Sequence, residues 1–177
     1  AVEQVPLDAW RLQVDVNLWG VIYGCHAFLP AMKSARRGAI INVASAAGLL
    51  SGAGMGPYNV TKAGVVALTE TLASELGGSG VTATVLCPTF FKTKVAQNGK
   101  HFGESDQRKM AEKLMDRSAL SADDVAELAL RGADAGALYV LPHADGRWMW
   151  RTKRAIPELF HKALGPRAMK LAGRFAR

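Results

Sequence analysis

The chain has 177 residues, of which 49% are hydrophobic and 21% are charged. This balance is typical of a globular domain with a sizeable core, and no apolar run is long enough to span a bilayer. The net charge of +7 is uneven, because residues 147–177 hold nine Lys or Arg and one acid, a local charge of +8, whereas residues 1–146 hold thirteen basic and fourteen acidic residues, a charge of −1. A body without net positive charge argues against a general nucleic-acid surface, so we expect no nucleic-acid partner.

A long helix is predicted from Asp8 to about Ala35, with Asp8 as its N-cap. Apolar residues recur there at helical spacing, at Trp10, Val14, Leu18, Val21, Ile22, Cys25, Leu29 and Met32. They occupy more than one side of the helix, so we expect it to be well buried. Arg36, Arg37 and Gly38 are expected to end it.

Three short apolar runs rich in β-branched residues predict buried parallel strands at 39–45, 81–88 and 137–142. Between the first two, the Gly-rich stretch 48–56 predicts a loop, and Pro57 fits the first turn of a helix over 58–77. Ser121 is expected to cap a further helix. The alternation of helices and strands predicts a doubly wound, Rossmann-like α/β fold with a parallel sheet.

The cysteines and histidines limit which disulfide and metal chemistry the chain can have. Cys25 and Cys87 lie inside apolar segments, so we expect buried free thiols and a reducing, cytoplasmic environment. The four histidines are too scattered along the sequence to indicate a metal site, and we expect none.

Tyr58 and Lys62 are four residues apart, which places them one turn apart on the same face of the predicted helix. A phenol has a pKa near 10, and acid/base work at neutral pH needs it lowered at a cost of about 3–4 kcal/mol. One ammonium at about 5 Å in an effective dielectric of about 20 supplies roughly 3 kcal/mol. Ser45 ends the preceding strand and could donate a hydrogen bond to a substrate oxygen. The alternative is a strand, a turn and a helix that hold these polar groups by chance.

Four stretches together resemble the classical short-chain dehydrogenase/reductase family: "DVNLWGV" (15–21), "NVAS" (42–45), "YNVTK" (58–62) and "VLCPTFFKT" (85–93). The resemblance covers about residues 8–142. It implies an oxidoreductase that moves a hydride between NAD or NADP and an alcohol or ketone.

The resemblance also assigns roles to residues. Tyr58 looks like the acid/base, Lys62 like the group that tunes it and binds the nicotinamide ribose, and Ser45 like the residue that orients the substrate oxygen. Asn17 matches a helix asparagine whose backbone carbonyl holds a relay water. The positions that match those lining the nicotinamide are Val43, Pro88, Phe91 and Thr93. The family usually has glycine where this chain has Thr89, which leaves the course of that loop open, since Thr does not take the positive φ open to Gly.

The family's Gly-rich phosphate loop and cofactor selector precede the region that the resemblance covers, so we expect this chain to be the C-terminal portion of a longer protein. We interpret 1–146 as a partial Rossmann-fold catalytic domain with a substrate lid at about 90–118, and 147–177 as a basic amphipathic extension. Two other functions stay open: a catalytically silent binding or scaffolding relative, and an epimerase or dehydratase of the same superfamily.

The expected lid favours an apolar or lipid-like substrate, such as a steroid, a retinoid or a long-chain alcohol. Its candidate lining residues are Phe90, Phe91, Phe102, Met110, Leu114 and Met115, and the alternative is that these side chains only pack the lid itself. Relatives pair through the first helix and the Tyr58 helix, so a homodimer or homotetramer is expected. The basic tail is expected either to pack against the protein or to rest on an anionic membrane surface.

Overall fold

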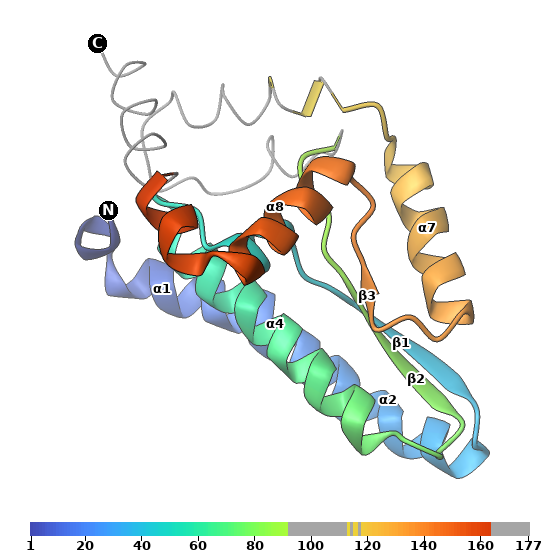
Figure 1. Cartoon of the computed structure of the whole chain (residues 1–177). Helices are drawn as coiled ribbons and strands as arrows, with labels where there is room; N and C mark the ends of the chain where they lie inside the picture. The colour runs from blue at the N-terminus through green and yellow to red at the C-terminus, as the bar shows by residue number, and fades with distance from the viewer. Residues whose placement is uncertain (92–112, 114, 117, 164–177) are drawn as a thin grey trace.

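The computed structural model describes residues 1–91, 113, 115–116 and 118–163 (Figure 1). Its sheet has three parallel strands in the order β1 (Gly38–Val43), β2 (Val81–Leu86) and β3 (Tyr139–Val140). Gly38 lies opposite Val81, and Val43 lies opposite Leu86. The predicted parallel α/β fold is confirmed. Each strand is shorter than predicted, because the chain leaves the sheet after Val43 and after Leu86 to build the candidate site.

A continuous helical run precedes the sheet. It consists of α1 (Leu7–Val14), a π-helical turn η2 (Asp15–Trp19) and α2 (Gly20–Ala35), and a 3₁₀ turn η1 (Val2–Gln4) lies before it. The prediction that Asp8 caps the run is wrong, since Pro6 is the N-cap and Asp8 lies in the first turn, where its carboxylate accepts from the Ala9 N–H at 2.8 Å. The end was predicted correctly, and Arg36 takes a left-handed conformation there, with φ of 52°.

The expectation that this run is well buried is also wrong. Only Ala9 and Cys25 are buried, and Trp19 and Tyr23, which stack with ring centroids 5.5 Å apart, are 44% and 64% exposed. The cause is that the run packs against α4 and β1 on one side only, so its second apolar side faces outward.

Two helices follow β1. The first turn of the predicted 48–56 loop is instead a short helix, α3 (Ala46–Leu50), because the Ser45 side chain caps it by accepting from the Ala47 N–H at 3.1 Å. α4 (Gly56–Glu75) then begins with Pro57 in its first turn, as predicted.

The sheet is covered on both faces, as Figure 1 shows, with α2 and α4 on one side and α7 (Ala122–Asp134) on the other. Residues of β2 alternate between these sides. Val81 and Ala83 pack with Cys25 and Leu72, whereas Leu86 packs with Val125 and Ala129 of α7. The predicted cap at Ser121 is confirmed as a capping box with Asp124.

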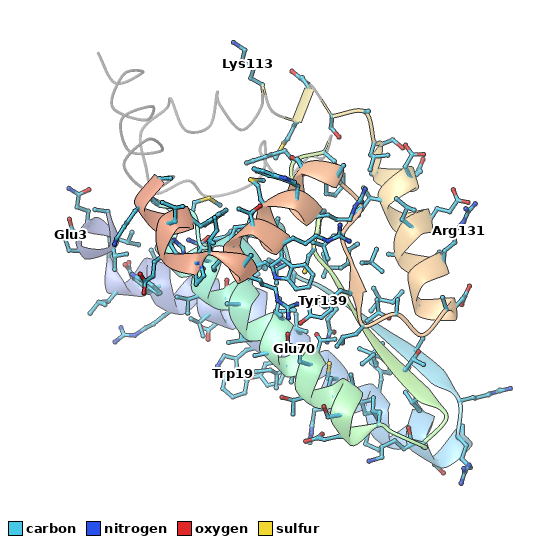
Figure 2. The ribbon with its side chains drawn as sticks, viewed as in Figure 1. Glu3, Trp19, Glu70, Lys113, Arg131 and Tyr139 are labelled. Carbon is cyan, nitrogen blue, oxygen red and sulfur yellow. The ribbon has the colours of Figure 1, made fainter. Side chains whose placement is uncertain are left out.

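The helix α8 (Ala144–Ala155) runs across the carboxyl ends of the strands, next to α3 (Figure 1). Its Trp150 packs on Tyr139 of β3 with the rings tilted and their centroids 4.9 Å apart. Tyr139 in turn donates a hydrogen bond to Glu70 of α4, and the two side chains point toward each other in Figure 2.

The interpreted boundary between 1–146 and 147–177 therefore falls inside one packed helix, and the basic extension begins as part of the fold. Residues 164–177 of the interpreted basic extension lie outside the described residues, and so does most of the expected lid.

Candidate active site

Ser45 stands where β1 passes into α3. Its backbone is extended, with φ of −171° and ψ of 158°, and its oxygen caps α3. The flanking amides fasten this turn to the neighbouring strand, since the Ala44 N–H donates to the Leu86 carbonyl and the Ala46 N–H donates to the Pro88 carbonyl, both at 2.9 Å. Ser45 is therefore held at the carboxyl edge of the sheet, where α/β folds bind ligands.

A glycine brings the Ser45 turn close to Lys62. A Cβ on Gly48 would lie 2.5 Å from the carbonyl carbon of Lys62 and 2.6 Å from its oxygen, which is closer than real Cβ contacts come. Only a residue without a Cβ lets α3 cross α4 at this point. The sequence pattern predicts a loop at Gly48 and does not indicate this role, because the crossing of two helices leaves no local signal.

Tyr58 lies in the first turn of α4, facing Ser45. Burial raises the pKa of its phenol, and a hydrogen bond with the Ser45 side chain lowers it by a smaller amount. The sequence predicted that the Lys62 ammonium would lower this pKa, and the net direction in the structure is the opposite. The reason is that the charge arithmetic omitted the cost of burying a phenolate.

Lys62 follows one turn later, as predicted. Its ammonium lies 5.8 Å from the centroid of the Tyr58 ring and donates to the Val43 carbonyl at 2.9 Å. Burial lowers the pKa of this amine. The structure thus brings Ser45, Tyr58 and Lys62 together at the end of β1.

Asn17 lies in the π-helical turn η2, and its side-chain amide donates to Gln13 at 2.8 Å. A π turn disturbs the regular carbonyl pattern of a helix and is common at functional sites. The turn η2 packs on α4 at Gly64, two residues after Lys62. A Cβ added to Gly64 would lie only 3.0 Å from the side chain of Leu18, which belongs to η2. The side chain of Asn17 is therefore used within its own helix, which leaves only its backbone for the role that the resemblance assigns.

The residues expected to line the cofactor gather at the same edge. Val43 is 52% exposed although it ends a strand, Pro88 is buried, and Phe91 packs beside Leu86 and Val125. Thr93 lies outside the described residues. The free thiols of Cys25 and Cys87 are buried, as predicted, and burial is the main cause that raises the pKa of Cys87 to about 12.

His143, which follows β3, also lies at this edge, and no pattern in the sequence indicates its role. The Thr89 N–H donates to His143 Nδ1 at 3.3 Å, and the Thr89 hydroxyl donates to Asp145 at 3.4 Å. The ring of His143 lies 6.2 Å from that of Phe91. Burial lowers the pKa of His143, which favours a neutral ring whose Nδ1 can accept. The loop that begins at Thr89, where the family usually has glycine, is thus tied to the end of β3.

Lys153 of α8 has a role that no pattern in the sequence indicates either. Its ammonium donates to the Leu49 carbonyl at 2.7 Å and to the Ser51 hydroxyl at 3.4 Å. These groups lie at the C-terminal end of α3, where carbonyls lack helical partners and a cation is favourable. The segment that starts with Ser45 is therefore fixed at both ends.

A parallel α/β fold in which Ser45, Tyr58 and Lys62 lie near the carboxyl end of β1 is what the resemblance to short-chain dehydrogenases predicts. The model of the short chain dehydrogenase family matches residues 1–102. This is more than half of the chain, so the chain belongs to that family.

Curated relatives agree with this membership. The chain is 36% identical over 95 residues to a 3-oxoacyl-[acyl-carrier-protein] reductase of Synechocystis sp., which covers 54% of this chain and 38% of the relative. It is 40% identical over 92 residues to a 3-alpha-(or 20-beta)-hydroxysteroid dehydrogenase of Mycobacterium tuberculosis, which covers 52% and 35%. An uncharacterized oxidoreductase of Staphylococcus saprophyticus is 35% identical over 127 residues, covering 71% and 50%. The chain spans half or less of the length of these relatives.

Solved structures give the same fold. A short-chain dehydrogenase/reductase from Burkholderia phymatum in complex with NAD superposes with a TM-score of 0.78 at 31% identity, over 88% of this chain and 60% of that one. A short-chain dehydrogenase from Burkholderia cenocepacia in complex with NADP has a TM-score of 0.72 at 23% identity, over 90% and 60%, and supports the fold alone. Among the helices that the structure describes, none combines the length and apolarity needed to cross a bilayer.

Proposed function

We propose that the protein containing this chain is an oxidoreductase that transfers a hydride between NAD or NADP and an alcohol or ketone. The observation that carries the proposal is the meeting of Ser45, Tyr58 and Lys62 at the carboxyl end of β1. Membership of the short chain dehydrogenase family supports it, and so does the relative from Burkholderia phymatum with its bound NAD.

Tyr58 is the proton donor and acceptor in this proposal. Because burial raises the pKa of the phenol, it carries its proton at neutral pH and can give it to the oxygen of a ketone while the carbonyl carbon gains a hydride. In the reverse direction the phenolate takes the proton of the alcohol. Ser45, which lies beside Tyr58, orients the same substrate oxygen and stabilises charge that develops on it.

The residues at this edge fit a nicotinamide cofactor, which supplies or accepts the hydride when bound. Val43 presents an exposed apolar surface beside Lys62, and the backbone of Pro88 is tied to the Ser45 turn. The Lys62 ammonium has three N–H groups and gives one to Val43, so it can also donate to ribose hydroxyls. Val43, Pro88 and Phe91 would line the ring, and Thr93 is assigned to the same role by resemblance.

For the substrate we propose an apolar or lipid-like alcohol or ketone. Phe90 and Phe91 stand at the entrance of the expected lid, and Phe90 is exposed. A relative named as a hydroxysteroid dehydrogenase, 40% identical over 92 residues, favours the same class. A panel that compares steroid and long-chain ketones with small polar ketones tests this, and a preference for the polar members contradicts it.

Substitution of the phenol tests the function itself. Tyr58→Phe in the full-length protein should lower turnover by about 10²–10⁴-fold, because only the proton-transferring hydroxyl is lost. Cofactor binding, measured by quenching of protein fluorescence, should stay within a few-fold of the parent. Activity above about a tenth of the parent would remove Tyr58 from the acid/base role. A full-length parent that binds NAD(P) but turns over no alcohol or ketone would favour the silent binding or scaffolding relative.

We also propose a homodimer. The outward side of the first helical run presents a stripe of large apolar side chains at Leu12, Val16, Trp19 and Tyr23, which recur at helical spacing. An isologous contact between two copies would cover this stripe from both sides.

For the tail we keep the proposal of a contact with an anionic membrane surface. The charge of +8 over 147–177 supports it, and so does Trp148, which is 68% exposed. Trp150 does not contribute, because it packs on Tyr139. Co-sedimentation of the full-length protein with anionic and neutral vesicles tests it, and equal pelleting on both lipids contradicts it.

A further inference from the structure

The two walls of the candidate site meet one common element. One wall is the Ser45 turn with α3, and the other is the segment Pro88–Phe91. Lys153 of α8 reaches the first wall, at the Leu49 carbonyl, and His143 and Asp145 at the start of α8 reach the second, at Thr89.

The helix α8 is itself anchored on the sheet. The guanidinium of Arg147 donates to the carbonyls of Leu141 and Pro142, at 2.7 and 2.8 Å, which ties the first turn of α8 to the end of β3. Trp150 packs on Tyr139 with the two rings tilted, and the Arg154 guanidinium lies 5.1 Å from the centroid of the Trp150 ring. These contacts hold α8 in place across the carboxyl edge of the sheet.

The contact at Thr89 is close. A Cβ on Gly146, in the first turn of α8, would lie 2.8 Å from the methyl group of Thr89. The threonine that replaces the family's usual glycine therefore supplies a methyl group that packs on α8 and a hydroxyl that bonds to Asp145. Thr89 and the first turn of α8 are thus in direct contact.

We propose that α8 is a positioning element of the active site, in which Lys153 places the Ser45 turn and His143 places the Pro88–Phe91 segment. The proposal rests on the proposed function, since Ser45 and Pro88 matter for catalysis only if that reaction occurs. Neither Lys153 nor His143 touches the reacting atoms, so both are positioning residues.

The primary test compares Lys153→Met with Lys153→Arg and Arg151→Met in the full-length protein. Arg151 is an exposed cation on the same helix, so its replacement controls for loss of charge. Amide hydrogen exchange of residues 44–51 is the readout that needs no activity. We expect faster exchange there in Lys153→Met, and parent-like exchange in Lys153→Arg, which keeps a donor, and in Arg151→Met.

Turnover is the second readout. A displacement of about 1 Å at a catalytic group can cost about 100-fold, so we expect kcat of Lys153→Met to fall by about 10–100-fold while the cofactor Kd changes by less than about threefold. Rescue by Lys153→Arg separates positioning from general destabilisation. Exchange and kcat that match Arg151→Met overturn the proposal, and so does a failure of Lys153→Arg to rescue.

A second pair covers the case in which Lys153→Met does not fold. In His143→Asn the side-chain oxygen can replace Nδ1 as the acceptor for the Thr89 N–H, whereas in His143→Phe no acceptor remains. We expect faster exchange over 87–91 in His143→Phe only, and equal exchange in both variants overturns the proposal. Because exchange is measured without substrate, faster exchange in Lys153→Met or His143→Phe shows that α8 holds these two segments even if the parent shows no turnover, an outcome that would count against the proposed function alone.

Discussion

Replacement of Lys62 by Met is the sharpest test of how the site sets the pKa of Tyr58. The change removes an ammonium that lies 5.8 Å from the centroid of the phenol ring and keeps a side chain of similar length. Burial already raises the pKa of this phenol. Loss of the cation leaves the buried phenolate with less compensation, so the pKa should rise further.

The magnitude follows from the distance. If the 5.8 Å to the ring centroid is taken as the charge separation, the attraction between an ammonium and a phenolate is about 3 kcal/mol in an effective dielectric of about 20 and about 1 kcal/mol in one of about 60. Lys62 is only partly buried, so the effect falls between these limits, which corresponds to a rise of about 0.7 to 2 in pKa.

The assay is the pH dependence of kcat for alcohol oxidation, which needs the phenolate, at saturating cofactor. In Lys62→Met the kinetic pKa of the rising limb should move to higher pH, and cofactor affinity should weaken because a ribose donor is lost. Lys62→Arg, which keeps a cation, should stay near the parent profile. A rising limb at the parental pH in Lys62→Met would refute the view that the ammonium tunes the phenol.

Three further outcomes are expected from the structure. Gly48→Ala should lower the free energy of unfolding by about 1–3 kcal/mol in denaturant titrations, because its Cβ would overlap the Lys62 backbone. Gly52→Ala, with no atom within 4 Å of its Cβ, is the matched control, and equal losses in the two variants would contradict the close crossing of α3 and α4. Tyr23→Arg should shift the dimer toward monomer in sedimentation velocity, and the control Leu130→Arg, on the exposed surface of α7, should not. A dimer that is unchanged in both variants would place the interface elsewhere. Burial lowers the folded-state pKa of His143, so its contribution to stability is present above the unfolded pKa of about 6.5 and is lost as pH falls through the folded value. The melting temperature of the parent should therefore fall more between pH 7.5 and 5 than that of His143→Asn, and parallel curves would rule this out.

Local patterns in the sequence were enough to predict the parallel α/β fold and the meeting of Ser45, Tyr58 and Lys62. The spacing of Tyr58 and Lys62 needs only helical geometry, and Ser45 follows from the end of a strand beside that helix. Ser121 was recognised as a cap for the same reason, since a cap depends on residues three positions apart.

The contacts that hold the site in place are not local. His143 lies 54 residues from Thr89, and Lys153 lies 104 residues from Leu49, so no periodicity connects them. The exposure of Trp19 and Tyr23 was missed because an apolar pattern does not distinguish a core from an uncovered surface. The direction of the Tyr58 pKa depends on burial, which the sequence does not state.

The strand β1 has a consequence for how this protein is handled. It pairs with β2 along one edge, and no described strand pairs with its other edge, where Ile40 and Ile41 continue an extended aliphatic run. Unpaired edges of this kind add strands from other chains and promote aggregation. Any piece of the protein in which β1 is outermost should therefore self-associate through its backbone, and such assemblies need to be distinguished from a dimer formed through helices.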